Sequence, residues 1–330
     1  MSELIRLMQN ECIKMFNKRR FLVIFLILLI LIPMFVYAQA RQSQTLQEKI
    51  GTDDWRTILQ QEIVDSQNRL TSSRIPEEWQ RLRKINIEIQ QFHLDHDINP
   101  FEPGGPTFAK EFMEQSTSLF LPLLVMIVAT DLVSGEHGAG TIKLLLSRPV
   151  RRWKILLSKL LSLSLFVSLI ISLLLAVSYV ISGIAFGFSG WTTPILTGFR
   201  VIGNQLDTSQ VGLIPLWQYL IMSAGLTWFV GVIVGIIALM ISVLVRSTAA
   251  GMGIMLATII SGTVLRSMAS SWEGAKYLFM LNLDLTQYLS GGMPPIPGMN
   301  LAFSITVLAS WALVALIIAF VTFNRQDMLA

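Results

Sequence analysis

The chain has 330 residues, of which 53% are hydrophobic and 14% charged, and its mean hydropathy is +0.60. A soluble domain has about a quarter of its residues charged, so this is the composition of a membrane protein. The net charge is +4, and the single cysteine, Cys12, excludes an intrachain disulfide and a cysteine zinc site. The sequence has no GxxxxGK[ST] or HExxH motif, so we expect no ATPase site and no enzyme activity of its own.

The first predicted element is a cytoplasmic amphipathic helix within residues 1–20. Apolar side chains recur at helical spacing on one face, and charged or amide side chains occupy the other. Such a helix lies flat at the headgroup boundary. The alternative is a plain basic anchor that only orients the first span. The apolar face comprises Leu4, Leu7, Met8, Cys12, Met15 and Phe16.

Six segments are apolar and long enough to cross a membrane, which takes about 20 residues. Lys and Arg gather before the first segment and between the second and third, which predicts that both termini are cytoplasmic. Ala38 and Ala40 form an Ala-x-Ala sequence like a signal-peptide cleavage site, but the long leading segment favours an uncleaved anchor. The six segments are 21–38, 117–133, 155–186, 217–245, 249–265 and 301–323.

Residues 39–116 are predicted to form an extracytoplasmic helical insert. Two apolar stripes at helical spacing flank "TSSRIP", in which Pro76 suits a helix start, so a helical hairpin is expected. "HLDHD" places His93 and His96 at i, i+3, but a zinc site needs three or four ligands. No metal site is therefore predicted.

Residues 117–330 are predicted to form a five-helix transmembrane core. In its external segment, 271–299, an apolar stretch precedes two glycines and three prolines. A short interfacial or re-entrant helix and an ordinary surface loop are both compatible with that pattern. No ionisable side chain lies deep in the predicted spans, which weighs against a proton- or ion-coupled carrier.

Small residues at four-residue spacing occur in two adjacent spans. Gly231 and Gly235 form a GxxxG motif, and Ala249 and Gly253 repeat the spacing in the next span. Small side chains let helix backbones approach closely. Packing within the chain and dimerisation are both open.

The loop at 134–154 is the most informative segment outside the membrane. Its glycines, including Gly138 and Gly140, predict a flexible exit from the second span, a short amphipathic helix is expected over 141–147, and Pro149 then redirects the chain. A short helix presented at the membrane face suits docking into a groove on a soluble partner. The alternative is a basic loop that binds only lipid headgroups.

This loop resembles the signature of bacterial ABC-2-type export permeases, which occurs between their second and third spans. The matching residues are Glu136, Gly140-Thr141, Leu145-Leu146-Ser147, Pro149, Arg152 and Lys159. The N-terminal elbow helix, the six spans and the ending "FNRQD" (323–327) are also similar to that family. The insert is longer than in the compact members.

The resemblance implies an all-α permease subunit in the bacterial cell membrane that exports a peptide antibiotic, drug or lipid. Two permease chains, identical or paralogous, would pair, and each would dock on a separate ATP-binding subunit that holds ATP and Mg. No cofactor or nucleic acid is expected on this chain. Glu136 would pair with a base on the ATPase or with Arg151 or Arg152. The expected coupling interface is Glu136, Gly138, Gly140, Thr141, Lys143, Leu145, Leu146, Arg148, Pro149, Arg151 and Arg152.

Two other classes of function are compatible with the sequence. One is an ATP-independent channel or carrier. The other is a membrane-anchored sensor or scaffold that acts through residues 41–115.

Overall fold

A computed structural model describes residues 2–52, 54–70, 77–142, 150–202, 205–268, 272–292 and 294–325. Its α-helices are α1 Ser2–Asn17, α2 Arg20–Ile50, α3 Trp55–Leu70, α4 Glu77–Asp95, α5 Gly105–Ser118, α6 Phe120–Ala129, α7 Asp131–Gly138, α9 Arg152–Phe186, α10 Leu216–Leu244, α11 Thr248–Met268, α12 Gln287–Ser290 and α13 Leu301–Arg325. Two 3₁₀-helices, η2 Glu273–Tyr277 and η3 Phe279–Asn282, precede α12. The strands are β1 Pro194–Thr197, β2 Arg200–Ile202, β3 Gln205–Asp207 and β4 Gly212–Pro215.

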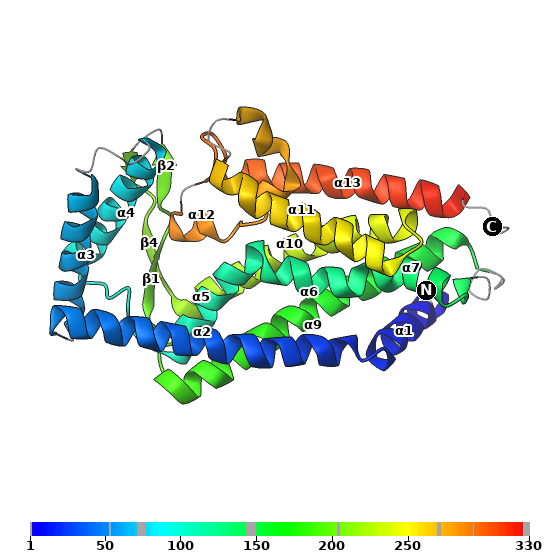
Figure 1. The fold of residues 1–330 in the computed structure, drawn as a ribbon, viewed down its shortest axis with the longest axis horizontal. Coiled ribbons are helices and arrows are strands. Elements are labelled where there is room, and N and C mark those ends of the chain that lie inside the picture. Colours follow the sequence, from blue (N-terminus) through cyan, green and yellow to red (C-terminus); the bar gives the residue numbers. More distant parts are fainter. Residues whose placement is uncertain are drawn as a thin grey trace.

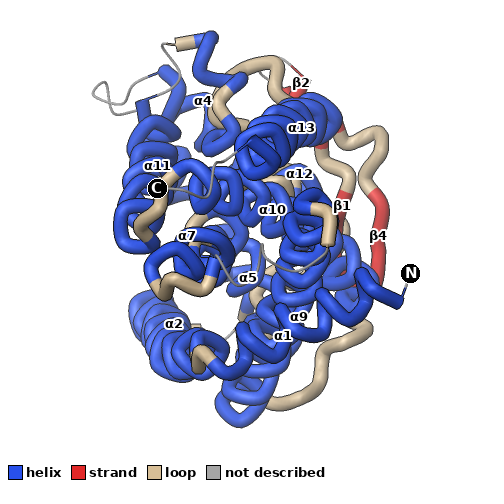
Figure 2. Tube along the Cα trace, turned by 90° about the vertical axis from the view of Figure 1, so that its right-hand side faces the viewer, coloured by secondary structure: helices blue, strands red, loops and turns tan. Residues whose placement is uncertain are grey.

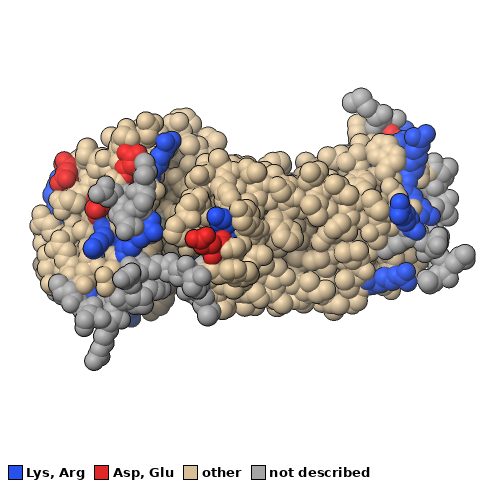
Figure 3. Space-filling model, turned by 90° about the horizontal axis from the view of Figure 1, so that it is seen from above, with Lys and Arg blue, Asp and Glu red and all other residues tan. Residues whose placement is uncertain are grey.

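The helices form an elongated bundle, and the predicted all-α polytopic fold is confirmed (Figure 1). Both chain ends lie at one end of the bundle, which we call the inner end; α3, α4 and the strands lie at the opposite, outer end. Between the charged side chains of the two ends, Figure 3 shows a wide band without Lys, Arg, Asp or Glu on the visible face. The six helices apolar and long enough to span a membrane cover Arg20–Thr45, Phe120–Gly138, Arg152–Phe186, Leu216–Leu244, Thr248–Arg266 and Leu301–Arg325.

Helix α10 lies at the centre of the bundle and packs against α5, α6, α9 and α13 (Figure 2). Its GxxxG motif explains why the neighbours come so close. A Cβ atom at Gly231 would lie 2.7 Å from Val167 of α9, and one at Gly235 would lie 2.9 Å from Leu163. The motif therefore serves packing within the chain. In α11, by contrast, a Cβ atom at Gly253 would meet nothing within 4 Å.

The second span, Phe120–Gly138, is built from two consecutive helices, α6 and α7, and α5 precedes it. The predicted segment, 117–133, begins slightly before this span and ends short of Gly138, and α5 adds helical structure from Gly105. Pro106 suits the first turn of α5, since its missing N–H would lack a helical partner there anyway. Helix α5 is amphipathic and charged, so a search for apolar runs does not include it.

The outer end is a folded unit of two helices and four short strands. Helix α2 continues past the end of its apolar span, Thr45, to Ile50, and α3 then packs against α4, as the predicted hairpin requires. The strands, which we did not predict, pair as β1 with β4 and β2 with β3, both antiparallel. Strand β3 contacts α4, and a small core joins them. This core comprises Ile98, Leu196 and Phe199, with Ile89, Phe92, Leu206 and Val211 packed around it.

The segment between α11 and α13 consists of short helical turns packed on the protein. Helix η3 contacts both long helices, and Phe279 is buried there. Asn282 is buried and donates its side-chain amide to the carbonyls of Lys276 and Leu278, both at 2.8 Å. These bonds satisfy irregular backbone that would be costly in an apolar environment. The segment therefore differs from a loop lying on the surface.

Candidate functional site

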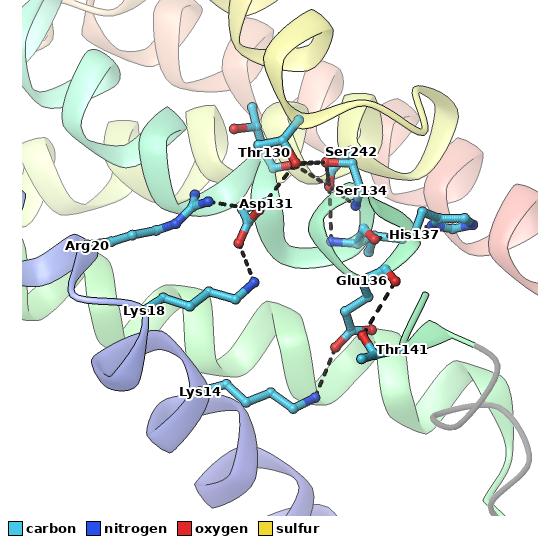
Figure 4. A network of polar contacts seen from close by, with 12 residues as sticks. Lys14, Lys18, Arg20, Thr130, Asp131, Ser134, Glu136, His137, Thr141 and Ser242 are labelled. Atoms are coloured by element: carbon cyan, nitrogen blue, oxygen red, sulfur yellow. Dashed lines mark hydrogen bonds and ion pairs between the residues drawn. The ribbon is translucent and has the colours of Figure 1, made fainter. Parts of the chain in front are cut away.

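A cluster of four charges, three of them buried, joins three helices at the inner end. The Lys159 ammonium of α9 is fully buried and lies 2.8 Å from Glu11 of α1 and 2.9 Å from Glu136 of α7. The Lys14 ammonium lies 3.0 Å from each of the same two carboxylates. Two positive and two negative charges thus alternate in contact. We call these four residues the inner cluster; Figure 4 shows its Lys14–Glu136 side.

Helix α1 brings two members of the inner cluster to the bundle because its buried stripe is not wholly apolar. Leu7, Glu11 and Met15 are buried at i, i+4 and i+8, and α1 packs along α9. The Ser162 hydroxyl of α9 also donates to the Met8 carbonyl at 3.3 Å. Helix α1 is therefore attached to the start of the third span, α9, by polar contacts as well as by apolar ones.

The charges in the inner cluster stabilise one another. Burial, the largest influence, raises the pKa of Glu11, but Lys159 and Lys14 outweigh it and hold that pKa below its usual value. Burial likewise lowers the pKa of Lys14, but Glu11 and Glu136 outweigh it and hold that pKa above its usual value. Burying a charge is costly unless it is paired. The four charges therefore depend on each other for their ionised state.

A second group of ion pairs lies beside the inner cluster, around Asp131 (Figure 4). Its carboxylate is buried and lies 2.6 Å from the Lys18 ammonium and 2.8 Å from the Arg20 guanidinium. A Cβ atom at Gly135 would lie 2.1 Å from Asp131 Oδ1. Gly135 therefore leaves room for the carboxylate to fold back along its own helix. Asp131 ties the start of α7 to the junction of α1 and α2.

Ser242 of α10 stabilises the break between α6 and α7. Its hydroxyl oxygen accepts from the backbone N–H groups of Val133 and Ser134, both at 3.0 Å, and donates to the Thr130 carbonyl at 2.7 Å. The first N–H groups of a helix have no partner within that helix. A side chain of the central span therefore caps α7. Thr248 of α11 joins the same group, 3.0 Å from Ser134.

The structure describes part of the predicted coupling interface, and it gives Gly138 and Glu136 other surroundings than the sequence predicted. Gly138 is the last residue of α7, so it is not part of the flexible exit that the glycines of the loop predicted. The chain turns at Gly140, which has a φ of +68°. Glu136 pairs with Lys14 and Lys159 within the chain, rather than with Arg151 or Arg152. The remaining predicted interface residues, Lys143, Leu145, Leu146, Arg148 and Pro149, lie outside the described residues.

The described arginines of the loop lie at its second root, where α9 begins. Arg151 is the exposed residue preceding α9, and Arg152 starts the helix. The Arg152 guanidinium donates to the Asn324 carbonyl at the end of α13, at 3.0 Å. At the first root, the Thr141 N–H donates to the Glu136 carbonyl at 3.0 Å. Both roots are thus fixed to spans of the bundle.

Sequence reasoning missed two members of the inner cluster, Glu11 and Lys14, as partners of the loop. Glu136 and Lys159 stand in the signature, but their contacts with α1 join residues more than 120 positions apart. One signal was present: Glu11 interrupts the apolar stripe of the amphipathic helix at a helical spacing from Leu7 and Met15. A charge inside an apolar stripe indicates a buried partner.

Comparisons with known proteins give a family but no activity. A family model described as "Protein of unknown function (DUF2705)" matches residues 99–329, which include α5 to α13 and leave α1 to α4 outside. The chain is 27% identical over 245 residues to the "Uncharacterized protein YhcI" of Bacillus subtilis (strain 168), covering 74% of this chain and 76% of the relative. It is 27% identical over 214 residues to the "Uncharacterized membrane protein YdbK" of the same strain, covering 64% and 79%.

Proposed function

The chain belongs to the DUF2705 family, and we propose that this member is the membrane-spanning permease subunit of an ATP-binding cassette exporter. A separate subunit would bind and hydrolyse ATP, and a second permease chain would complete the substrate path. The proposed substrate is apolar or amphipathic, such as a peptide antibiotic, a drug or a lipid. The observation that carries the proposal is the inner cluster, which lies at both roots of the loop between the second and third spans.

The position of the inner cluster suits the transmission of force from a soluble partner. A partner that moves the loop pulls on Glu136 at one root and on the start of α9 at the other. Lys159 holds α9 to both α7 and α1 through contacts of 2.8 and 2.9 Å. Separating the two charges of a buried ion pair is energetically costly, because each charge would be left unpaired. The three helices would therefore move together rather than slide past one another.

The charge distribution supports a cytoplasmic inner end, where such an ATPase would dock. Exposed arginines at this end include Arg19, Arg151, Arg246 and Arg325. Cytoplasmic segments near spans carry an excess of Lys and Arg. The loop signature at Glu136–Lys159 gives the family resemblance its most specific support, and it lies at this same end.

The test is purification of the full-length chain from bacterial membranes in a mild detergent, with ATPase activity measured on the eluate. The first variant has residues 143–148 scrambled, which leaves all four members of the inner cluster in place. The matched control is Lys154→Met on α9, whose partly exposed side chain contacts Glu3 rather than the inner cluster. We expect an ATP-binding subunit with the wild type and the control, and at least a tenfold loss of it with the scrambled loop.

The thermal midpoint of each variant separates a lost docking surface from a lost fold. The scrambled chain should unfold at the wild-type temperature if the loop serves docking only, because the contacts of the inner cluster are unchanged. Absence of any ATPase from the wild-type and control preparations would contradict the proposal. Equal recovery of the ATPase with the scrambled loop would remove the loop from the docking role.

The folded outer unit favours one second candidate, a membrane-anchored sensor. Helix α4 packs on strand β3, and the Leu206 N–H donates to Glu88 at 3.2 Å, so this unit has its own core and polar contacts. The experiment replaces residues 52–97 with a short flexible linker. A permease should still recover its ATPase after this deletion, whereas a sensor should lose its response to an external ligand.

A further inference from the structure

Figure 1 shows a sharp turn between α1 and α2 at the inner end of the bundle, and Arg19 forms this turn. The Arg19 N–H donates to the Phe16 carbonyl at 3.1 Å, and the Arg19 carbonyl accepts from the Val23 N–H at 3.1 Å. Arg19 has a φ of +54°, in the left-handed region that glycine adopts most readily. An arginine is thus held in a disfavoured backbone conformation, which directs attention to a use for its side chain.

The positive charge at this turn exceeds the negative charge. Lys18 and Arg20 flank Arg19 in the sequence. Both pair with Asp131, at 2.6 and 2.8 Å, and Figure 4 shows their side chains pointing toward this carboxylate. The Thr248 hydroxyl also donates to Asp131 Oδ1 at 3.2 Å, so three groups already share the carboxylate. Three cations and one carboxylate give the turn a formal charge of 3 − 1 = +2.

Two adjacent side chains of the turn have N–H groups left for an anion. Arg19 is exposed, and within the part of the chain that the structure describes it forms no ion pair. The Lys18 side chain is 44% exposed, and its ammonium has three N–H donors, of which one is used on Asp131. The planar donors of a guanidinium match the oxygens of a phosphate, and an ammonium binds phosphate as a point charge. Phosphate is therefore the anion that these two side chains suit.

Exposed apolar side chains flank the turn on both sides and identify the source of the phosphate. Phe16, one turn before Arg19, is 50% exposed, and Leu22 and Val23, one turn after it, are 54% and 46% exposed. The ring centres of Phe16 and Phe21 lie 5.8 Å apart, so apolar side chains also bridge the turn. Helix α2 then continues as the first apolar span. A soluble phosphate leaves these side chains uncovered, whereas the acyl chains of a phospholipid cover them.

We propose that Lys18 and Arg19 bind the phosphate of an anionic phospholipid, such as phosphatidylglycerol, at the turn between α1 and α2. The Arg19 guanidinium and the Lys18 ammonium contact phosphate oxygens, and the acyl chains lie along the exposed apolar face of α2. One phosphodiester lowers the formal charge of the turn from +2 to +1. Because Lys18 also pairs with Asp131, the bound lipid stabilises the attachment of this turn to α7. The site is independent of the proposed permease function, because lipid binding can be measured on the isolated chain.

The experiment measures phospholipid bound to the full-length chain by native mass spectrometry from a neutral detergent. Phosphatidylglycerol and phosphatidylcholine with the same acyl chains are titrated separately. The test variant is Arg19→Gly, which removes the guanidinium and adopts the φ of +54° without strain. The matched control is Arg246→Gln, which removes an exposed arginine from the turn between α10 and α11 at the same end of the bundle. Thermal midpoints are recorded for each chain with and without lipid.

We expect the wild type to bind phosphatidylglycerol more tightly than phosphatidylcholine. Arg19→Gly should weaken phosphatidylglycerol binding by about fivefold or more, the effect of one cation near an anionic headgroup, and Arg246→Gln should keep the wild-type affinity. Without lipid, Arg19→Gly should unfold at or above the wild-type temperature, because glycine relieves the disfavoured turn. Added phosphatidylglycerol should raise the midpoint of the wild type and of the control more than that of Arg19→Gly.

Four results would overturn the proposal. Equal binding of phosphatidylglycerol to the wild type and Arg19→Gly would remove the guanidinium from the site. An equal loss in Arg246→Gln would show attraction by the general charge of this end instead of a site. A lipid-free Arg19→Gly chain that unfolds well below the wild type would show that Arg19 serves the turn itself. Displacement of the lipid by an equal concentration of glycerol phosphate would assign the site to a soluble anion.

Discussion

Removal of the Lys159 ammonium is the sharpest perturbation of the inner cluster. The change Lys159→Met keeps an unbranched side chain of similar length and takes away one positive charge. The cluster then holds two buried carboxylates and one lysine, so its formal charge changes from 2 − 2 = 0 to 1 − 2 = −1. The remaining lysine, Lys14, has a side chain that is 39% exposed and cannot neutralise both.

The contacts of Lys159 set the size of the effect. At an effective dielectric constant of about 20, two ion pairs near 2.8 Å attract by roughly 12 kcal/mol in total, and desolvation of the buried charges offsets most of that. Breaking a buried pair by removing one partner leaves a net cost of about 3 to 5 kcal/mol. We expect a loss of unfolding free energy in that range for Lys159→Met.

The assay is unfolding of the purified chain in detergent by urea, followed by tryptophan fluorescence. Lys154→Met is the control, because it removes the same group from the same helix where both partners are substantially exposed, and it should change the midpoint little. The double change Lys159→Met/Glu136→Gln should recover part of the loss, by about 1 to 3 kcal/mol, because it restores neutrality. If Lys159→Met is as mild as Lys154→Met, the inner cluster does not hold the three helices together.

Two further predictions concern pH and helix packing. Because the pKa of Glu11 is lowered in the folded state, its contribution to stability is full above pH 4.5 and is lost as the pH falls through the folded pKa. Because the pKa of Lys14 is raised in the folded state, its contribution is full below pH 10.5 and is lost as the pH rises through the folded pKa. The midpoint difference between wild type and Lys159→Met should therefore be constant from about pH 5 to pH 10 and shrink in acid; a difference that grows in acid would contradict this. Gly235→Leu should cost about 1 to 3 kcal/mol and reduce the folded yield, since its Cβ would lie 2.9 Å from Leu163, whereas Gly253→Leu on the open side of α11 should fold normally. Equal yields for the two leucine variants on size-exclusion chromatography would show that Gly235 does not limit packing.

The sequence predicted the number of spans well because long apolar runs are sufficient for a membrane helix. The helices around the spans were harder to predict, since α2 continues to Ile50 and α5 begins at Gly105 through polar helix-forming residues. Strands β1 to β4 were missed because each has only three or four residues, too few to show an alternating pattern.

The candidate site was only half predictable for a related reason. The loop residues Glu136 and Lys159 belong to a local signature, so a single sequence suffices to notice them. Their partners on α1 come together only through tertiary packing. Gly135 shows the same limit. A glycine near a turn predicts a flexible segment, but Gly135 lies inside α7. Glycine is needed there because the Asp131 carboxylate fills the space that a side chain would occupy. Local pattern cannot tell these two uses of glycine apart.

Helix α2 can act as a lever between the two ends of the molecule. Its 31 residues are about 47 Å long at 1.5 Å per residue. One end is pinned through Arg20 to Asp131, and the other leads directly into α3 of the outer unit. A tilt of about 10° at the pinned end would carry the far end sideways by roughly 8 Å over that length. Pro33 is the point at which this lever would bend first, because its nitrogen has no hydrogen to donate. Small displacements at the inner end would thus reach the outer unit enlarged.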